Sequence, residues 1–150
     1  MKRSSPRRRA RELALQGLYQ QHVGGADPAA IRAHWAEQPG YEDADRDFLD
    51  ELWRGVIAEQ EMLLSELAPH LDRKPAALSP VERAILVIGA WELLRRLDTP
   101  YKVVINEAVE LAKSYGGTDG HRFVNGVLDK LAARVRATEI AALRRERGDL

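Results

Sequence analysis

Residues 104–131 read VINEAVELAKSYGGTDGHRFVNGVLDKL and carry two apolar stripes on either side of a glycine-rich turn. Apolar side chains recur every three or four positions over residues 105–112, and residues 123–131 repeat that spacing after the turn. Gly116-Gly117 is predicted to end the first helix in a left-handed cap. Asp119 stands where an N-cap of the second helix is expected. The segment therefore predicts a helical hairpin.

The same periodicity runs through the rest of the chain. Further helices are predicted over about residues 6–19, 28–38, 43–68, 81–94 and 136–145. Ser5 is the expected N-cap of the first, and Ser79-Pro80-Val81-Glu82 forms a capping box before the fourth. Residues 84–91 are apolar on nearly all sides, which is typical of a central, buried helix.

Six or seven helices with no alternating strand pattern predict an all-α fold. The connection over residues 69–79 divides it into two packed helical bundles that form one compact unit. We expect a single domain over residues 1–150. Its N-terminal helical half spans about 6–72, its C-terminal half about 73–135, and a charged tail about 136–150. A domain of this size buries roughly 68–70% of the surface that its unfolded chain exposes, so it can form a stable core without disulfides or a structural metal.

Composition narrows the class of protein. The chain has no cysteine, which excludes disulfides, thiol nucleophiles and thiolate metal sites. It has neither an apolar run long enough to span a membrane nor a secretory signal, so we expect a cytoplasmic protein without membrane association.

The formal net charge of zero conceals strong segregation along the chain. Residues 1–11 carry a net charge of +6, residues 12–72 carry −10, and residues 73–150 carry +4. A polyanion would be attracted by the first and third portions and repelled by the second, so a nucleic-acid site must be a local patch. A merely solvated basic terminus is the alternative.

Signatures of enzymes are absent from the sequence. The histidines are scattered, without metal-ligand spacing: His22, His34, His70 and His121. Gly116-Gly117 lacks the preceding strand and following lysine of a phosphate loop, and Glu107 and Glu110 fit a solvated helix stripe better than an acid/base pair. We therefore predict no enzymatic activity, no cofactor and no metal.

Arginines at the start of the first helix favour RNA binding. Arg7, Arg8, Arg9 and Arg11 radiate around the helix, and guanidinium groups both pair with phosphate and stack on bases. Tyr19 lies eight residues beyond Arg11, or ~12 Å along the helix. Its ring is a candidate RNA contact, with core packing as the alternative.

The start of the helix after Gly116-Gly117 supplies a second group of candidates. Arg122 and Phe123 lie in its first turn, where unpaired backbone N–H groups favour anions and an aromatic ring can stack on a base. Core packing is the alternative for the ring. Three lysines could extend the phosphate track, although a solvated role is expected for the last: Lys102, Lys113 and Lys130.

Asn125-Gly126 stands in the middle of that helix, where glycine costs ~1 kcal/mol relative to alanine. Close approach of two helices is the simplest reason, with Asn106 or Asn125 bonding across the contact. We expect a structural role for Asn106 and Gly126, whereas Asn125 stays a candidate RNA contact.

The arginine-dense entry RRRAREL at residues 7–13, combined with residues 104–131, closely resembles the NusB family of bacterial transcription antitermination factors. The resemblance runs from about Arg7 to Leu131. It implies two helical bundles set across one another, binding of single-stranded boxA RNA together with the ribosomal small-subunit protein NusE, and support of RNA polymerase read-through, notably in ribosomal RNA operons.

The resemblance also assigns roles to residues. The helix-one arginines, Tyr19, Asp119 and Phe123 match the family's RNA surface, and Glu82 matches a position that meets the protein partner. Gly120 departs from the family pattern, because a small hydroxyl residue is frequent there. Some members self-associate through the RNA-binding surface, and the sequence leaves open whether this chain is a monomer or a homodimer.

Two alternatives belong to other classes. The same fold occurs as the N-terminal domain of ribosomal-RNA cytosine methyltransferases, but the sequence has no cysteine and no glycine-rich cofactor loop after a strand, so this interpretation requires the chain to be a fragment. The other is a helical adaptor that binds proteins without RNA. Salt-dependent RNA binding distinguishes it from an RNA-binding factor.

Overall fold

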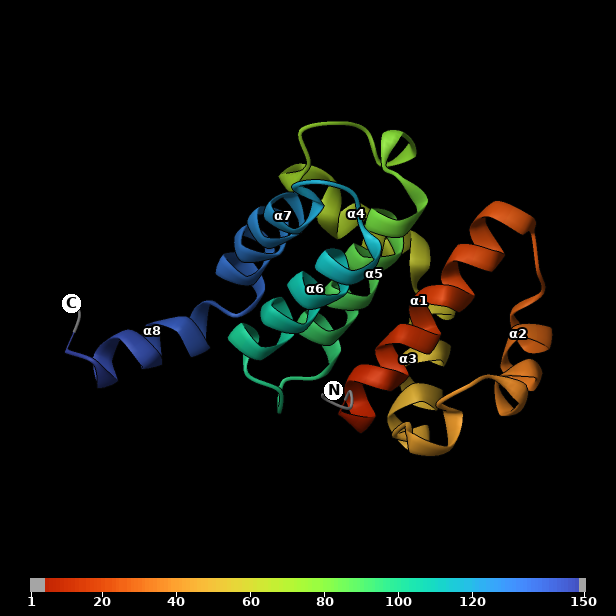
Figure 1. Ribbon diagram of the computed structural model, residues 1–150. Coiled ribbons are helices and arrows are strands. Elements are labelled where there is room, and N and C mark those ends of the chain that lie inside the picture. The colour runs from red at the N-terminus through yellow and green to blue at the C-terminus, as the bar shows by residue number, and fades with distance from the viewer. Residues whose placement is uncertain (1–4, 149–150) are drawn as a thin grey trace.

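The structure, a computed structural model, describes residues 5–148 and contains only helices in that range (Figure 1). The eight α-helices are α1 (Pro6–Gly24), α2 (Pro28–His34), α3 (Arg46–Ala58), α4 (Gln60–Leu67), α5 (Pro80–Arg95), α6 (Tyr101–Tyr115), α7 (Gly120–Val135) and α8 (Ala137–Glu146). Four single-turn 3₁₀ helices join them: η1 (Trp35–Glu37), η2 (Tyr41–Asp43), η3 (Ala68–His70) and η4 (Pro75–Ala77). The predicted all-α fold is confirmed.

Helix α5 is the centre of the molecule and contacts α1, α3, α4, α6 and α7 (Figure 1). Every residue from Ala84 to Leu93 is buried, as its apolar sequence predicted. Gly89 permits a close contact with α7, because a Cβ there would lie 2.7 Å from Leu128 Cδ1. The hydrophobic core is accordingly one cluster that extends from α1 to α7.

Two predicted helix starts are confirmed in detail. The Ser5 hydroxyl accepts a hydrogen bond from the Arg8 backbone N–H at 3.1 Å, and the Ser79 hydroxyl accepts one from Glu82 at 3.2 Å. Since these bonds satisfy N–H groups that have no intrahelical partner, they fix where α1 and α5 begin.

The prediction of a single helix over residues 43–68 is wrong. The structure has a turn of 3₁₀ helix, then α3, and then α4 after a break at Glu59, whose φ is −113° and ψ 17°. Both helices pack on α5, and the Glu59 carboxylate accepts bonds of 3.0 and 2.7 Å from Arg95 at the end of α5. Tertiary packing thus bends a segment that is continuously helical by periodicity. The helix predicted to reach residue 38 is likewise shorter, because α2 gives way to η1.

The turn between α6 and α7 also differs from expectation. Gly116 is extended, with φ −85° and ψ 174°, and the left-handed residue is Asp119, with φ 64°. Glycine is still required at position 116, because a Cβ would lie 2.7 Å from the Ala112 carbonyl oxygen. Aspartate is among the few residue types that tolerate the left-handed region.

Helix α8 projects from the bundle but is anchored at its start (Figure 1). The buried Arg136 guanidinium donates to the backbone carbonyls of Glu92, Leu93, Arg96 and Thr99. Glu139 accepts a 2.9 Å bond from the Tyr101 backbone N–H, at the first residue of α6. The helix predicted over residues 136–145 is therefore present. Within residues 5–148, no helix has the length and apolarity to cross a membrane.

Candidate nucleic-acid interface

Arg11 requires a correction, because its side chain is not available to RNA. The residue is 3% exposed, and its guanidinium donates to both carboxylate oxygens of Glu92 at 2.8 and 2.7 Å. A second carboxylate, Glu107, lies 3.7 Å away. Arg11 shares the buried face of α1 with Ala14 and Leu18, three and seven residues on, so its role is to pair with Glu92 inside the core.

The other three arginines bind neighbouring segments while staying partly exposed. Arg8 forms a bidentate pair with Glu107 of α6, at 2.9 and 3.1 Å, and this pair raises the pKa of Arg8. The Arg7 guanidinium lies 3.4 Å from Asp45. Arg9 is the most enclosed of the three, and it contacts Glu12 and the Pro39 carbonyl. Phosphate would therefore meet Arg7 and Arg8 first, in competition with a carboxylate.

Tyr19 is 43% exposed, so part of its side chain lies at the surface of α1. Tyr115, at the end of α6, is 39% exposed, and its hydroxyl donates a 3.0 Å bond to Glu12 of α1. Burial of part of the ring and the bond to Glu12 raise the pKa of Tyr115. Tyr115 is not among the residues predicted from sequence to contact RNA. Its only signal was its place directly before Gly116, at the end of the apolar stripe.

Polar and aromatic side chains of α1 and α6 line the surface where the two helices meet. Arg8, Glu12 and Tyr19 follow at intervals of four and seven residues, so they share one face of α1 and extend over ~16 Å. Contacts from α6 meet this face at both Arg8 and Glu12. We call Arg8, Glu12, Tyr19, Glu107 and Tyr115 the α1–α6 strip.

Asp119 and Arg122 lie exposed at the start of α7, with 3.7 Å between Asp119 Oδ1 and Arg122 Nε. The prediction that the Asp119 side chain caps α7 is wrong, because that side chain makes no capping bond. Its left-handed backbone instead directs its carbonyl to the N–H groups of Arg122 and Phe123. Gly120, next in the chain, is buried close to Glu82.

Phe123 faces the connection between α4 and α5 and not the α1–α6 strip. The ring is half-buried against the core, and the Arg73 guanidinium lies 4.5 Å from its centroid. With Arg122, His70 and Lys130 it lines a pocket of about 240 Å³. A base could stack on the outer face of the ring only after Arg73 moved away.

The remaining candidates lie at the surface of α6 and α7. Asn125, Lys102, Lys113 and Lys130 are all exposed. The proposed close approach at Gly126 is wrong, since a Cβ there would meet nothing within 4 Å. Asn106 is exposed as well, so the asparagines do not bond across a tight helix contact there. Over residues 5–148, no group of three or more His, Asp or Glu side chains could hold a metal ion.

Glu82 is half-buried at the start of α5. Its carboxylate accepts a 3.1 Å hydrogen bond from the Ser79 hydroxyl, and its backbone N–H bonds to the same oxygen. The capping role is therefore present in the structure. Because Glu82 also adjoins Gly120, it lies at the contact between the starts of α5 and α7.

Comparison with known proteins identifies the family. The model of the NusB family matches residues 8–133, which include most of α1 and all of α2 to α6. The chain belongs to the NusB family. The match ends before α8, so this helix lies outside the region that the family model describes.

Similar NusB proteins span almost the same length. The transcription antitermination protein NusB of Dechloromonas aromatica is 56% identical over 138 residues, covering 92% of this chain and 85% of that protein. The protein of the same name from Ralstonia nicotianae is 58% identical over 140 residues, covering 93% and 90%. The chain is thus a transcription antitermination protein and not an enzyme.

Solved structures give the same fold. T. maritima NusB superposes with a TM-score of 0.74 at 30% identity, covering 89% of this chain and 94% of that one. A chain from the crystal structure of a plectonemic RNA supercoil superposes with a TM-score of 0.71 at 26% identity, covering 83% and 91%. Both superpositions support the all-α fold.

Proposed function

We propose that this NusB protein binds single-stranded boxA-type RNA through the α1–α6 strip and the start of α7. The observation that carries the proposal is the exposure of Tyr19 and Tyr115 along the same junction at which Arg8 is held. Exposed aromatic rings stack on unpaired bases, and guanidinium groups pair with the phosphates between them.

The start of α7 supplies the second part of the proposed RNA surface. Arg122 is exposed beside Asp119, and Asn125 lies one turn further along the helix. Lys102 is exposed at the other end of α6 from Tyr115, five residues before Glu107, so it would contact RNA that continues past Arg8. Phe123 joins the site if a base displaces Arg73 from its ring, as the resemblance to the family implies.

We further propose that the ribosomal protein NusE binds beside the RNA and that the complex supports RNA polymerase read-through in the cytoplasm, notably in ribosomal RNA operons. Glu82 supports this proposal, because it places a carboxylate at the contact of α5 and α7, where a basic ribosomal protein could pair with it. Glu82→Gln should weaken NusE association with little change in melting temperature, since glutamine also fits a capping box. Equal NusE affinity would leave Glu82 with the capping role alone.

Titration of a short boxA-like RNA, with and without NusE, tests the RNA proposal. Tyr19→Ala and Tyr115→Ala should each weaken binding by about 1–3 kcal/mol, the range of one stacked base. Leu97→Ala is the matched control, because Leu97 is exposed but lies in the connection between α5 and α6. Unchanged affinity in both tyrosine variants would remove the α1–α6 strip from the interface. Sedimentation of the free protein shows whether a homodimer covers the strip.

A second titration decides the role of Phe123. Phe123→Ala should weaken RNA binding by about 1–3 kcal/mol if the ring stacks. It should also lower the free energy of unfolding by less than the roughly 3–5 kcal/mol typical of a fully buried phenylalanine. Arg73→Ala serves as the control, because it uncovers the ring without removing it. A destabilised Phe123→Ala variant that binds RNA normally when folded would restrict the ring to core packing.

A further inference from the structure

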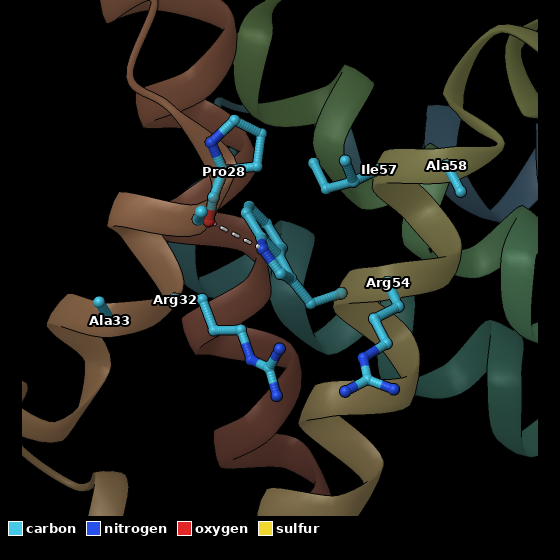
Figure 2. A pocket seen from close by; sticks show the side chains of 8 residues that line it. Pro28, Arg32, Ala33, Arg54, Ile57 and Ala58 are labelled. Carbon is cyan, nitrogen blue, oxygen red and sulfur yellow. Dashed lines mark hydrogen bonds between the residues drawn. The ribbon is translucent and has the colours of Figure 1, made fainter.

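A groove of about 710 Å³ lies between α2 and α3, on elements that contribute nothing to the α1–α6 strip (Figure 2). Its volume is within the roughly 300–1,000 Å³ of ligand-binding clefts. Four lining residues come from each helix: Pro28, Ala29, Arg32 and Ala33 from α2, and Trp53, Arg54, Ile57 and Ala58 from α3.

The walls of this groove are fixed by contacts between the two helices. The Trp53 indole N–H donates a 3.2 Å hydrogen bond to the Pro28 carbonyl, which Figure 2 shows across the groove. The same indole packs edge-on against Trp35, with 5.1 Å between the ring centroids. Arg32 of α2 bonds to Asp50 of α3 at 3.1 Å. A ligand would therefore meet a preformed surface, and binding would cost little ordering of the protein.

The surface of the groove is mostly apolar. Trp53 is 3% exposed and forms the floor, while Ile57 and Pro28 are half-buried beside it. The rims consist of small exposed side chains, namely Ala29, Ala33 and Ala58. Such rims let the backbone of another chain approach closely, so that one of its apolar side chains can reach the floor.

The two arginines that line the groove favour an acidic ligand. Residues 12–72 contain only three basic residues, Arg32, Arg46 and Arg54, and two of them line this groove. Figure 2 shows the Arg32 and Arg54 guanidiniums at the same end of the groove. Arg32 is paired with Asp50, whereas Arg54 is exposed and forms no ion pair with another residue of the described range 5–148. The free guanidinium is placed to accept a carboxylate.

The net charge of −10 over residues 12–72 repels a polyanion such as a nucleic acid, whereas a single carboxylate needs only one cation, which Arg54 supplies. An apolar floor also lacks partners for successive phosphates. We propose that the groove between α2 and α3 binds a short segment of a protein partner that combines an apolar side chain with a neighbouring aspartate or glutamate. The apolar side chain fills the space over Trp53 and Ile57, and the carboxylate pairs with Arg54 at the basic end.

Selection from a displayed library of random twelve-residue peptides tests this proposal with the full chain as bait. Peptides that bind wild type should be enriched in an apolar residue followed closely by Asp or Glu. The selected peptide should bind Ala58→Trp, which fills the groove, and Arg54→Glu, which reverses its charge, about tenfold or more weakly. Ala141→Trp and Arg144→Glu on α8 are the matched controls and should bind as wild type does.

Other outcomes would overturn the proposal. Selected peptides that lack acidic residues, or that bind all four variants equally, would exclude a carboxylate-reading groove. A dimer in sedimentation that Ala58→Trp dissociates would assign the groove to a second copy of the chain. Weaker boxA-like RNA binding by Arg54→Glu would assign it to RNA. Should Ala58→Trp lower the melting temperature, Arg54→Glu, at an exposed position, decides the question alone.

Discussion

Arg11 and Glu92 show how strongly the burial of one residue determines its role. Four arginines stand within five positions at the start of α1, yet only Arg11 faces the core, where it pairs with Glu92, the buried carboxylate of α5. Both signals were present in the sequence: Arg11 shares a helix face with Ala14 and Leu18, and Glu92 interrupts an apolar run. What the sequence could not show is that the two faces meet.

Removing one member of this pair should be strongly destabilising. Arg11→Ala leaves the Glu92 carboxylate buried without its partner, so we expect a loss of about 3–5 kcal/mol in the free energy of unfolding, measured with urea. Arg8→Ala is the matched control, because the Arg8–Glu107 pair is partly exposed and should be worth about 0–1 kcal/mol. The double variant Arg11→Leu with Glu92→Leu should recover most of the loss. Equal effects of Arg11→Ala and Arg8→Ala would contradict this account.

Asp119 should restrain RNA binding. Its carboxylate lies beside Arg122 on the proposed RNA surface, so Asp119→Asn removes a repulsion toward phosphate. Asparagine also tolerates the left-handed backbone, and α7 should stay intact because the Asp119 side chain makes no capping bond. We expect a gain on the order of 1 kcal/mol, larger at low salt. Titration at two salt concentrations measures it. Weaker binding at both would mean that the carboxylate accepts hydrogen bonds from a base.

At the scale of elements, periodicity predicted which segments are helical but not where helices bend or turn. Apolar spacing is continuous through Glu59, and the break there arises because both α3 and α4 pack on α5. The turn after α6 was placed correctly, yet its left-handed residue is Asp119 and not Gly116. Gly126 was taken to signal a close helix contact, whereas it lies beside open space in a surface pocket.

Helix α8 should depend on Arg136 for its position. The guanidinium satisfies four backbone carbonyls at the end of α5 and after it, and few other contacts hold the helix, none of whose residues is buried. Arg136→Met should increase amide hydrogen exchange in residues 137–146 and at the start of α6, where Glu139 accepts from Tyr101. Arg144→Met, at an exposed position, is the control. Unchanged exchange in α8 would show that another contact anchors it.

For the whole molecule, charge segregation matters more than the net charge of zero. The basic start of the chain and the acidic region over residues 12–72 predict a local RNA patch, which stays a prediction, while the structure shows which groups its arginines contact. Arg7 and Arg8 are each paired with a carboxylate from a distant segment, Asp45 and Glu107, which no periodicity could indicate. Tyr115 joins the α1–α6 strip for the same reason, since its partner Glu12 is 103 positions away.

The dependence of RNA affinity on salt should separate these arginines. Each phosphate contact that is lost from single-stranded RNA lowers the slope of log K against log salt by roughly 0.7. Arg7→Ala and Arg8→Ala should each show this change, and Arg9→Ala should show less, because its side chain is 19% exposed and is held by Glu12 and Pro39. Titrations of each variant between low and moderate salt give the slopes.

Glu107→Gln completes the test, because it removes the acidic member of the Arg8–Glu107 ion pair and leaves Arg8 in place. With Arg8 present, removing the Glu107 charge frees a guanidinium for phosphate and removes a repulsion, so affinity should rise while the slope stays at the wild-type value or steepens. Arg8→Ala should instead lower the RNA affinity and make the slope shallower, since it removes a cation and leaves the Glu107 carboxylate unpaired on the α1–α6 strip. If the two variants instead change the slope in the same direction, Arg8 contacts no phosphate, and its pairing with Glu107 only fixes α1 against α6.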